Sequence, residues 1–115
     1  MRKSLFALLL ISSGAMADEP GYKLHIDSSV EAAKLTVIPV ITAPAGSRLR
    51  YEMVSSKEGA SGSSSTRQAG GVMVGADGTA KLSTLKLGVG AADHYLITVK
   101  VYDGAKLVAE GFFNH

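Results

Sequence analysis

The 115-residue chain contains no cysteine and no tryptophan, and only three of its residues are phenylalanine. Without cysteine the protein cannot form disulfides, perform thiol redox chemistry or bind a metal through thiolate ligands. A chain of this length is expected to fold as one domain, whose stability then depends on a single apolar core. Because aromatic residues are scarce, that core must be mainly aliphatic.

The chain also lacks a hydrophobic run long enough for a membrane-spanning helix, which needs roughly 20 apolar residues. Its N-terminus instead has Arg2 and Lys3, then the apolar run 5–11, then Ala15-Met16-Ala17. This order is typical of a secretory signal peptide with a small-x-small cleavage site. We therefore expect a cleaved signal peptide at residues 1–17, a single domain at residues 18–115, export from the cytoplasm and no stable membrane association.

An excess of positive charge is absent from the expected mature chain. The full sequence has 12 Lys and Arg residues against 10 Asp and Glu residues, and Arg2 and Lys3 account for the whole surplus. A protein without net positive charge has no bulk electrostatic attraction for nucleic acid. We therefore expect no nucleic-acid partner, and attention turns to where the remaining cations lie.

Recognisable catalytic motifs are also lacking. His25, His94 and His115 have no metal-ligand spacing, and no GxSxG sequence positions a nucleophilic serine. The glycine- and serine-rich stretch 59–66 is not followed by GK[ST] or by a helical pattern, so it does not read as a phosphate-binding loop. The sequence predicts no enzyme, no metal and no cofactor.

Most of the chain has apolar residues at every second position, the pattern of half-buried strands. Seven strands are expected, at residues 22–27, 34–42, 48–54, 65–74, 79–87, 94–102 and 106–113. Asp77-Gly78 and Asp103-Gly104 are turn dipeptides, and the second predicts a tight hairpin. Pro39 places the second strand at a sheet edge or at a bulge. Seven short strands in about 100 residues predict an all-β, immunoglobulin-like antiparallel β-sandwich.

Two further features concern the interior of this predicted sandwich. Tyr95, near the start of the sixth strand, is expected to form a tyrosine corner, in which the hydroxyl bonds to backbone upstream. The stretch YEMVSSKEGASGSSSTRQ, residues 51–68, is expected to be the end of the third strand and a flexible connection to the fourth.

Several sequence blocks resemble one known family. The chain reads KEGASGSSSTRQ at 57–68, LSTLKLGVGAADHYLITVKVYDG at 82–104 and VIPV at 37–40. These blocks resemble the periplasmic curli assembly inhibitors of the CsgC and CsgH type, and the most specific part is the pattern Glu-Gly to Thr-basic-Gln. The resemblance implies an immunoglobulin-like sandwich that keeps the unfolded curli subunit from nucleating amyloid, through transient, electrostatically guided contact. Some members carry a Cys-x-Cys pair where this chain has Ser47 and Leu49, so redox chemistry is not expected here.

Strand geometry and the resemblance together predict a basic partner-binding surface. Alternation turns Arg48, Arg50 and Lys100 away from the core, with the third and sixth strands side by side. The family match reaches Arg50, Lys57 and Arg67. The candidate site therefore comprises Arg48, Arg50, Lys57, Arg67 and Lys100, beside Leu96, Thr98 and Tyr102.

Two alternatives remain open at this stage. Outward charges on strands also serve solubility and edge protection, without any partner. A small periplasmic adhesion or carbohydrate-binding sandwich would use Tyr102 or Phe112 as its exposed aromatic. The leading expectation is a monomeric, non-enzymatic periplasmic inhibitor whose partner is an unfolded curli subunit.

Overall fold

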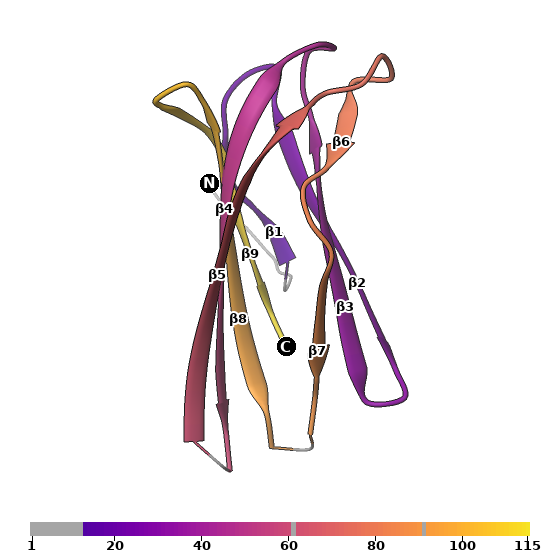
Figure 1. Ribbon diagram of the computed structural model, residues 1–115, viewed down its shortest axis with the longest axis vertical. Coiled ribbons are helices and arrows are strands. Elements are labelled where there is room, and N and C mark those ends of the chain that lie inside the picture. The colour runs from indigo at the N-terminus through magenta and orange to yellow at the C-terminus, as the bar shows by residue number, and fades with distance from the viewer. Residues whose placement is uncertain (1–12, 61, 91) are drawn as a thin grey trace, which may run out of the picture.

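The computed structural model describes residues 13–60, 62–90 and 92–115, and these residues form nine β-strands and no helix. Figure 1 shows the strands lying roughly along the long axis of the molecule. The strands are β1 (Ser13–Asp18), β2 (Lys23–Glu31), β3 (Lys34–Thr42), β4 (Arg48–Gly59), β5 (Gly62–Met73), β6 (Thr79–Lys81), β7 (Leu85–Gly88), β8 (His94–Asp103) and β9 (Lys106–Asn114).

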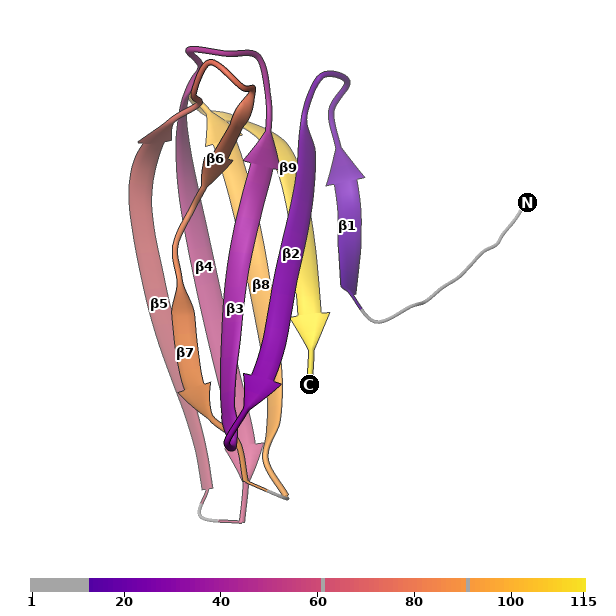
Figure 2. The ribbon, with the colours of Figure 1, turned by 90° about the vertical axis from the view of Figure 1, so that its right-hand side faces the viewer.

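The strands form two antiparallel sheets that pack face to face. The five-stranded sheet has the order β1-β9-β8-β4-β5, and the four-stranded sheet contains β2, β3, β6 and β7. Figure 1 shows the two layers edge-on, and Figure 2 shows them with the four-stranded sheet in front. The predicted all-β sandwich is confirmed, and so is the predicted pairing of the third and sixth strands, which are β4 and β8.

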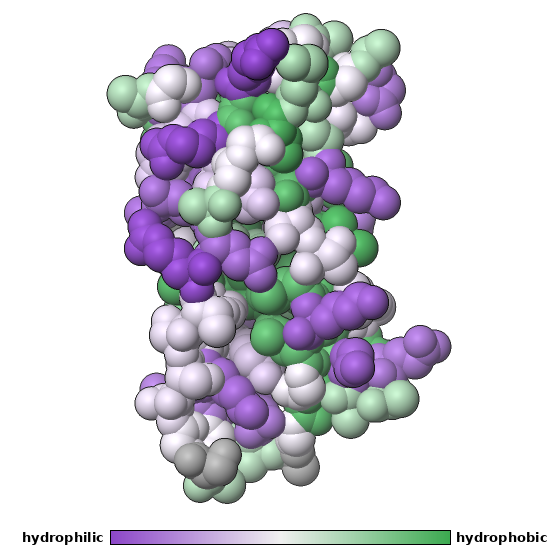
Figure 3. Space-filling model, in the orientation of Figure 1, coloured by the Kyte–Doolittle hydropathy of each residue, from purple (hydrophilic) through white to green (hydrophobic). Residues whose placement is uncertain are grey.

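The core lies between the sheets and is supplied by the inward residues of each alternating strand. The inward side chains of the two central strands are completely buried: Leu35, Val37 and Ile41 on β3, and Ile97, Val99 and Val101 on β8. In Figure 3, hydrophobic residues gather along the seam between the layers and hydrophilic residues lie on either side of it. Burial of the core is the main favourable term in forming the sandwich, as expected for a domain without cross-links.

The strand count differs from the seven that the sequence predicts. The expected strand at 79–87 is divided into β6 and β7, which pair with different parts of β3. The strand β1 was not predicted, because its residues lie in the segment expected to be a signal peptide. Residues 1–12 of that segment are outside the described residues, whereas Ser13–Asp18 pair with β9.

Pro39 was predicted to lie on an edge strand or at a bulge, and the edge placement is wrong. The β2–β3 ladder also has no register shift at Pro39. The strand β3 is flanked by β2 on one side and by β6 and β7 on the other. The carbonyl of Pro39 accepts a hydrogen bond from the Leu82 N–H, at 2.9 Å, in the gap between β6 and β7. The nitrogen of Pro39, which has no hydrogen to donate, therefore faces the gap between β6 and β7, where no strand needs a donor. This explains how a central strand tolerates the proline.

The glycine- and serine-rich stretch is not a flexible connection. The ladder between β4 and β5 runs without a break from Arg48↔Met73 to Gly59↔Gly62. Residues 57–68 are thus the end of a long hairpin. The predicted third strand, which ended at Val54, was too short, because β4 continues to Gly59. Inside this hairpin, the hydroxyls of Ser55 and Thr66 lie 2.6 Å apart.

The turns follow the predicted punctuation, with one exception. Gly78 and Gly104 both have positive φ, of +80° and +64°, and Gly104 lies in the tight β8–β9 hairpin. The β2–β3 turn instead places two alanines, Ala32 and Ala33, at φ values of +52° and +61°. Left-handed backbone is unfavourable for alanine, so this turn holds local strain.

Tyr95 forms the predicted tyrosine corner. Its ring is buried, and its hydroxyl donates a hydrogen bond to the backbone carbonyl of Gly88, seven residues upstream. This bond ties β8 to the end of β7 on the opposite sheet. The role is structural, as expected from the sequence.

Candidate functional site

The outer face of the five-stranded sheet carries most of the predicted site. Along β4, Leu49 and Met53 are buried while Arg48 and Arg50 are exposed, because successive side chains of a strand point to opposite faces. Lys100 lies directly opposite Glu52 on the neighbouring strand, and Arg67 lies opposite Val54. We call Arg48, Arg50, Arg67 and Lys100 the outer-face cations.

Lys57 does not belong to this group. It follows Met53 and Ser55 in the inward parity of β4, and its ammonium lies 3.4 Å from a carboxylate oxygen of Asp93. The N–H of Gly90 also donates to Asp93, at 2.8 Å, and this bond together with Lys57 lowers the pKa of Asp93. Lys57 thus anchors the loop before β8, and the prediction that it lies in the basic patch places it on the wrong side of the sheet.

Two carboxylates hold three of the outer-face cations in place. Glu52 contacts Arg50 at 3.2 Å and Arg67 at 3.0 Å, whereas Glu110 lies 4.0 Å from Lys100. The pairs are partly exposed, so each contributes little to stability, but together they orient the guanidinium groups. Arg48 has no ion pair among the described residues.

The sequence prediction listed only the cations and left out both glutamates. The position of Glu52 could have been inferred, because it shares the outward parity of Arg48 and Arg50 on one strand. Glu110 could not, since its approach to Lys100 depends on the β8–β9 register. The surface is therefore an array of mixed charge rather than a purely basic patch. Its cations are in excess near the start of β4, where Arg48 and Arg50 lie.

An aromatic ring lies within this array. The guanidinium carbon of Arg50 is 4.4 Å from the centroid of the Tyr102 ring, a cation–π contact across the β4–β8 ladder. The contact covers one face of Tyr102 and fixes the direction in which Arg50 points.

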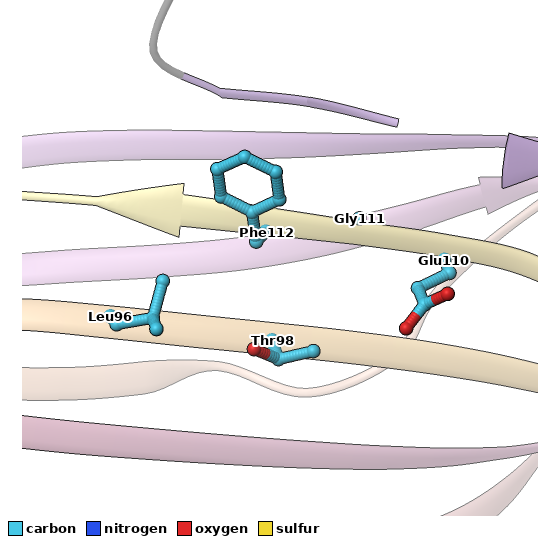
Figure 4. A pocket seen from close by; sticks show the side chains of 5 residues that line it. All are labelled: Leu96, Thr98, Glu110, Gly111 and Phe112. Atoms are coloured by element: carbon cyan, nitrogen blue, oxygen red, sulfur yellow. The ribbon is translucent and has the colours of Figure 1, made fainter. Parts of the chain in front are cut away.

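Next to the cations the same face is hollowed and apolar. A depression of about 400 Å³ is lined by Leu96, Thr98, Glu110, Gly111 and Phe112, from β8 and β9. Figure 4 shows the Phe112 ring and the Leu96 side chain at one end of this depression and Glu110 towards the other. Leu96 is 45% exposed, a high value for a leucine on a sheet. We call this depression the β8–β9 hollow.

The β8–β9 hollow continues into the charged part of the face. A second depression, of about 280 Å³, shares Thr98 with it and is otherwise lined by Glu52, Val54, Arg67 and Lys100. The apolar hollow and the charged residues are thus adjacent on one face of the sheet. The sequence predicted the neighbourhood of Leu96, Thr98 and Tyr102, but not the contribution of β9.

The outer face of the other sheet also carries exposed lysines. Lys34, Lys81 and Lys86 lie on β3, β6 and β7, and the last two are opposite Val40 and Thr36. None of the three forms an ion pair within the described part of the chain. They were not predicted as site residues, and they provide an internal comparison for any effect of charge alone.

Within the described residues, no helix is long and apolar enough to cross a membrane, and no group of three or more His, Asp or Glu residues is arranged to hold a metal ion. His25, His94 and His115 are all exposed, on three different strands or strand ends. The outer face of the five-stranded sheet offers charge, hydrogen-bonding groups and apolar area for contact with a partner.

The solved structures that resemble this fold include the following two. The solution structure of R. palustris CsgH superposes with a TM-score of 0.64 at 23% identity, covering 80% of this chain and 91% of that chain. The E. coli curli protein CsgC superposes with a TM-score of 0.66 at 25% identity, covering 78% of this chain and 96% of that chain. No curated protein sequence matches the chain.

The sequence itself matches a family over nearly the whole described region. Residues 19–111 match the family Tafi-CsgC, described as thin aggregative fimbriae synthesis protein. The match extends from just after β1 to Gly111 in β9, so it includes all four outer-face cations and the lining of the β8–β9 hollow except Phe112. The chain therefore belongs to the Tafi-CsgC family of thin aggregative fimbriae synthesis proteins.

Proposed function

We propose that this protein is a periplasmic, non-enzymatic inhibitor of curli amyloid nucleation that binds unfolded curli subunits transiently. The family match and the curli-related structural neighbours support a role in curli assembly. The observation that carries the finer proposal is the outer face of the five-stranded sheet, where Arg48, Arg50 and Lys100 lie beside an exposed apolar hollow. The signal peptide expected at residues 1–17 supports a periplasmic location for the mature chain.

The proposed mechanism separates attraction from contact. Charged residues act over about 8 Å at physiological ionic strength, so the outer-face cations raise the rate at which an oppositely charged segment arrives. Apolar residues such as Leu96 and Phe112 then contact the segment at short range. Since amyloid nuclei grow by strand pairing and side-chain interdigitation, brief occupation of the nucleating segment delays growth without catalysis or a cofactor.

The proposal is tested by following fibrillation of the curli subunit with thioflavin fluorescence. Residues 18–115 should lengthen the lag phase at a substoichiometric ratio. The triple variant Arg48→Glu, Arg50→Glu and Lys100→Glu should lose most of this delay, because the steering charge is reversed where the contact surface lies.

A matched control separates site-specific steering from net charge. The variant Lys34→Glu, Lys81→Glu and Lys86→Glu makes the same change in charge on the outer face of the other sheet. It should retain the delay. Equal loss in both variants would show that only net charge matters, and no delay by the unsubstituted chain would reject the inhibitor function itself.

The carbohydrate-binding alternative gains little from the geometry. A sugar-stacking site needs an open aromatic face, and Arg50 covers one face of Tyr102. Phe112 is the remaining candidate, and it lies in the β8–β9 hollow. Strong signals on a glycan array that disappear in Phe112→Ala would favour this alternative.

A further inference from the structure

The strand β1 covers part of one edge of the five-stranded sheet. It runs antiparallel to β9, with Gly14 opposite Phe112 and Ala17 opposite Glu110. The cleavage site expected after Ala17 lies inside this strand. Removal of residues 1–17 would therefore take away the backbone that pairs with β9 beyond Ala109.

The rest of the sandwich has a core of its own. All buried core residues whose burial the structure describes lie between Leu24 and Phe113. Glu19, which stays in the mature chain, donates its N–H to the Val108 carbonyl at 2.9 Å, and its carboxylate lies 3.2 Å from Lys106. We therefore expect the fold to be retained after cleavage, with an opened edge that begins at Glu110.

The hydrogen bonds show which backbone groups this edge presents. The N–H and carbonyl of His115 both bond to the backbone of Tyr95, so His115 points towards β8. Because the direction alternates along an antiparallel strand, Phe113 and Gly111 also point towards β8. The N–H and carbonyl groups of Phe112 and Glu110 point the other way, towards β1.

The β8–β9 hollow lies alongside the same stretch of edge. Leu96 and Phe112 line it, and the residue of β1 opposite Phe112 is a glycine. Residues directly opposite each other in a ladder share one face of the sheet. A strand with an apolar side chain at the position of Gly14 would therefore place that side chain next to the hollow.

We infer that the edge of β9 from Glu110 to Asn114 is a docking site for one extended segment of the unfolded curli subunit, which pairs antiparallel to β9. This inference deepens the proposed function and rests on it. The strand β1 shows the register that an added strand takes. Strand addition to an open edge supplies affinity through main-chain hydrogen bonds and specificity through alternate side chains, and it occupies the groups through which an amyloid segment would recruit the next copy.

The test uses amide hydrogen exchange on two chains, residues 18–115 and residues 13–115, the second of which retains β1. In the shorter chain the amides of Glu110 and Phe112 should exchange fast, and addition of the purified unfolded subunit should slow them by about tenfold or more. The amides of Gly111 and Phe113 point to β8 and serve as internal controls that should not change. The longer chain should be protected from the start and should delay fibrillation less.

The outcomes separate this inference from the proposed function. If the shorter chain delays fibrillation while the Glu110 and Phe112 amides stay unprotected, or if both chains delay equally, the edge is not the docking site and the inhibitor function stands. If neither chain delays fibrillation, both proposals fail. Protection of these amides in the shorter chain alone, together with a dimer in sedimentation, would assign the edge to a second copy and overturn the inference.

A pair of substitutions isolates the backbone group from the side chain. Phe112→Ala removes the ring and keeps the outward N–H, whereas Phe112→Pro removes both, at a position where the ladder to β8 does not use that N–H. Thermal unfolding confirms that each variant is folded. The proline variant should lose clearly more of the fibrillation delay than the alanine variant, and an equal loss in the two would show that no strand pairs here.

Discussion

The β2–β3 turn contains strain that can be removed by substitution. Glu31 and Lys34 pair, and the two residues between them, Ala32 and Ala33, have φ values of +52° and +61°. Two-residue hairpin turns with positive φ at both positions favour Asn-Gly. The double change Ala32→Asn and Ala33→Gly should therefore stabilise the protein.

The size of the effect follows from two opposing terms. Left-handed backbone costs a non-glycine residue about 1–2 kcal/mol, and asparagine less. Glycine relieves this cost but adds about 0.5–1 kcal/mol of unfolded-state entropy. The net gain in the free energy of unfolding should be about 1 kcal/mol, which corresponds to a Tm increase of roughly 4–8 °C for a domain of this size.

Differential scanning calorimetry measures this change directly, and the chain offers a matched control. Ala105 occupies the second position of the two-residue β8–β9 turn, after Gly104, and its φ is not positive. Ala105→Gly should lower Tm, because glycine adds entropy to the unfolded state without relieving strain. A Tm decrease for Ala33→Gly similar to that for Ala105→Gly would refute the reasoning.

Two further predictions concern the start of β8 and the loop before it. Tyr95→Phe should reduce the free energy of unfolding by about 1–2 kcal/mol in urea titrations, because the Gly88 carbonyl loses its hydrogen bond while the ring remains buried. Asp93→Asn should destabilise the protein at neutral pH and have little effect at the acid end of a pH titration of Tm. The pKa of Asp93 is lowered by the Gly90 N–H and by Lys57, so its stabilisation is present above the ordinary carboxyl range near 4 and is lost as pH falls through the lowered value.

Alternation along the strands was the most informative signal in the sequence. It predicted correctly which side chains of β4 and β8 point into the core. A one-residue shift in register would have exposed Met53 and Val99 and buried Arg48. Hydrophobic periodicity of this kind depends on a sequence only a few residues long. It can therefore be recognised within one strand, without knowing which strand pairs with it.

The errors arose where a feature depends on a distant segment. Lys57 was included in the basic patch because it matches a basic position of the family motif, whereas pairing with β5 extends β4 to Gly59 and keeps Lys57 in the inward parity. Pro39 was assigned to an edge or a bulge because the interruption between β6 and β7 cannot be inferred from the sequence of β3 itself. Both outcomes are decided by the neighbouring strand.

The outer-face cations and the β9 edge should act at different stages of one binding event. Surface charge changes association rates and their salt dependence, whereas short-range contacts change dissociation rates. The triple variant of Arg48, Arg50 and Lys100 should therefore slow association with the unfolded subunit and weaken its dependence on salt. Phe112→Pro should instead accelerate dissociation and leave the salt dependence of association unchanged.

Surface plasmon resonance with the immobilised unfolded subunit separates the two rates. Because Lys100 and Phe112 lie on neighbouring strands, with Glu110 within 4.0 Å of Lys100, some coupling between the two sites is expected at equilibrium. The rates themselves should still divide as described, since attraction over a Debye length does not require the strand to be paired. If both variants alter only dissociation, the cations contact the docked segment directly and do not steer it.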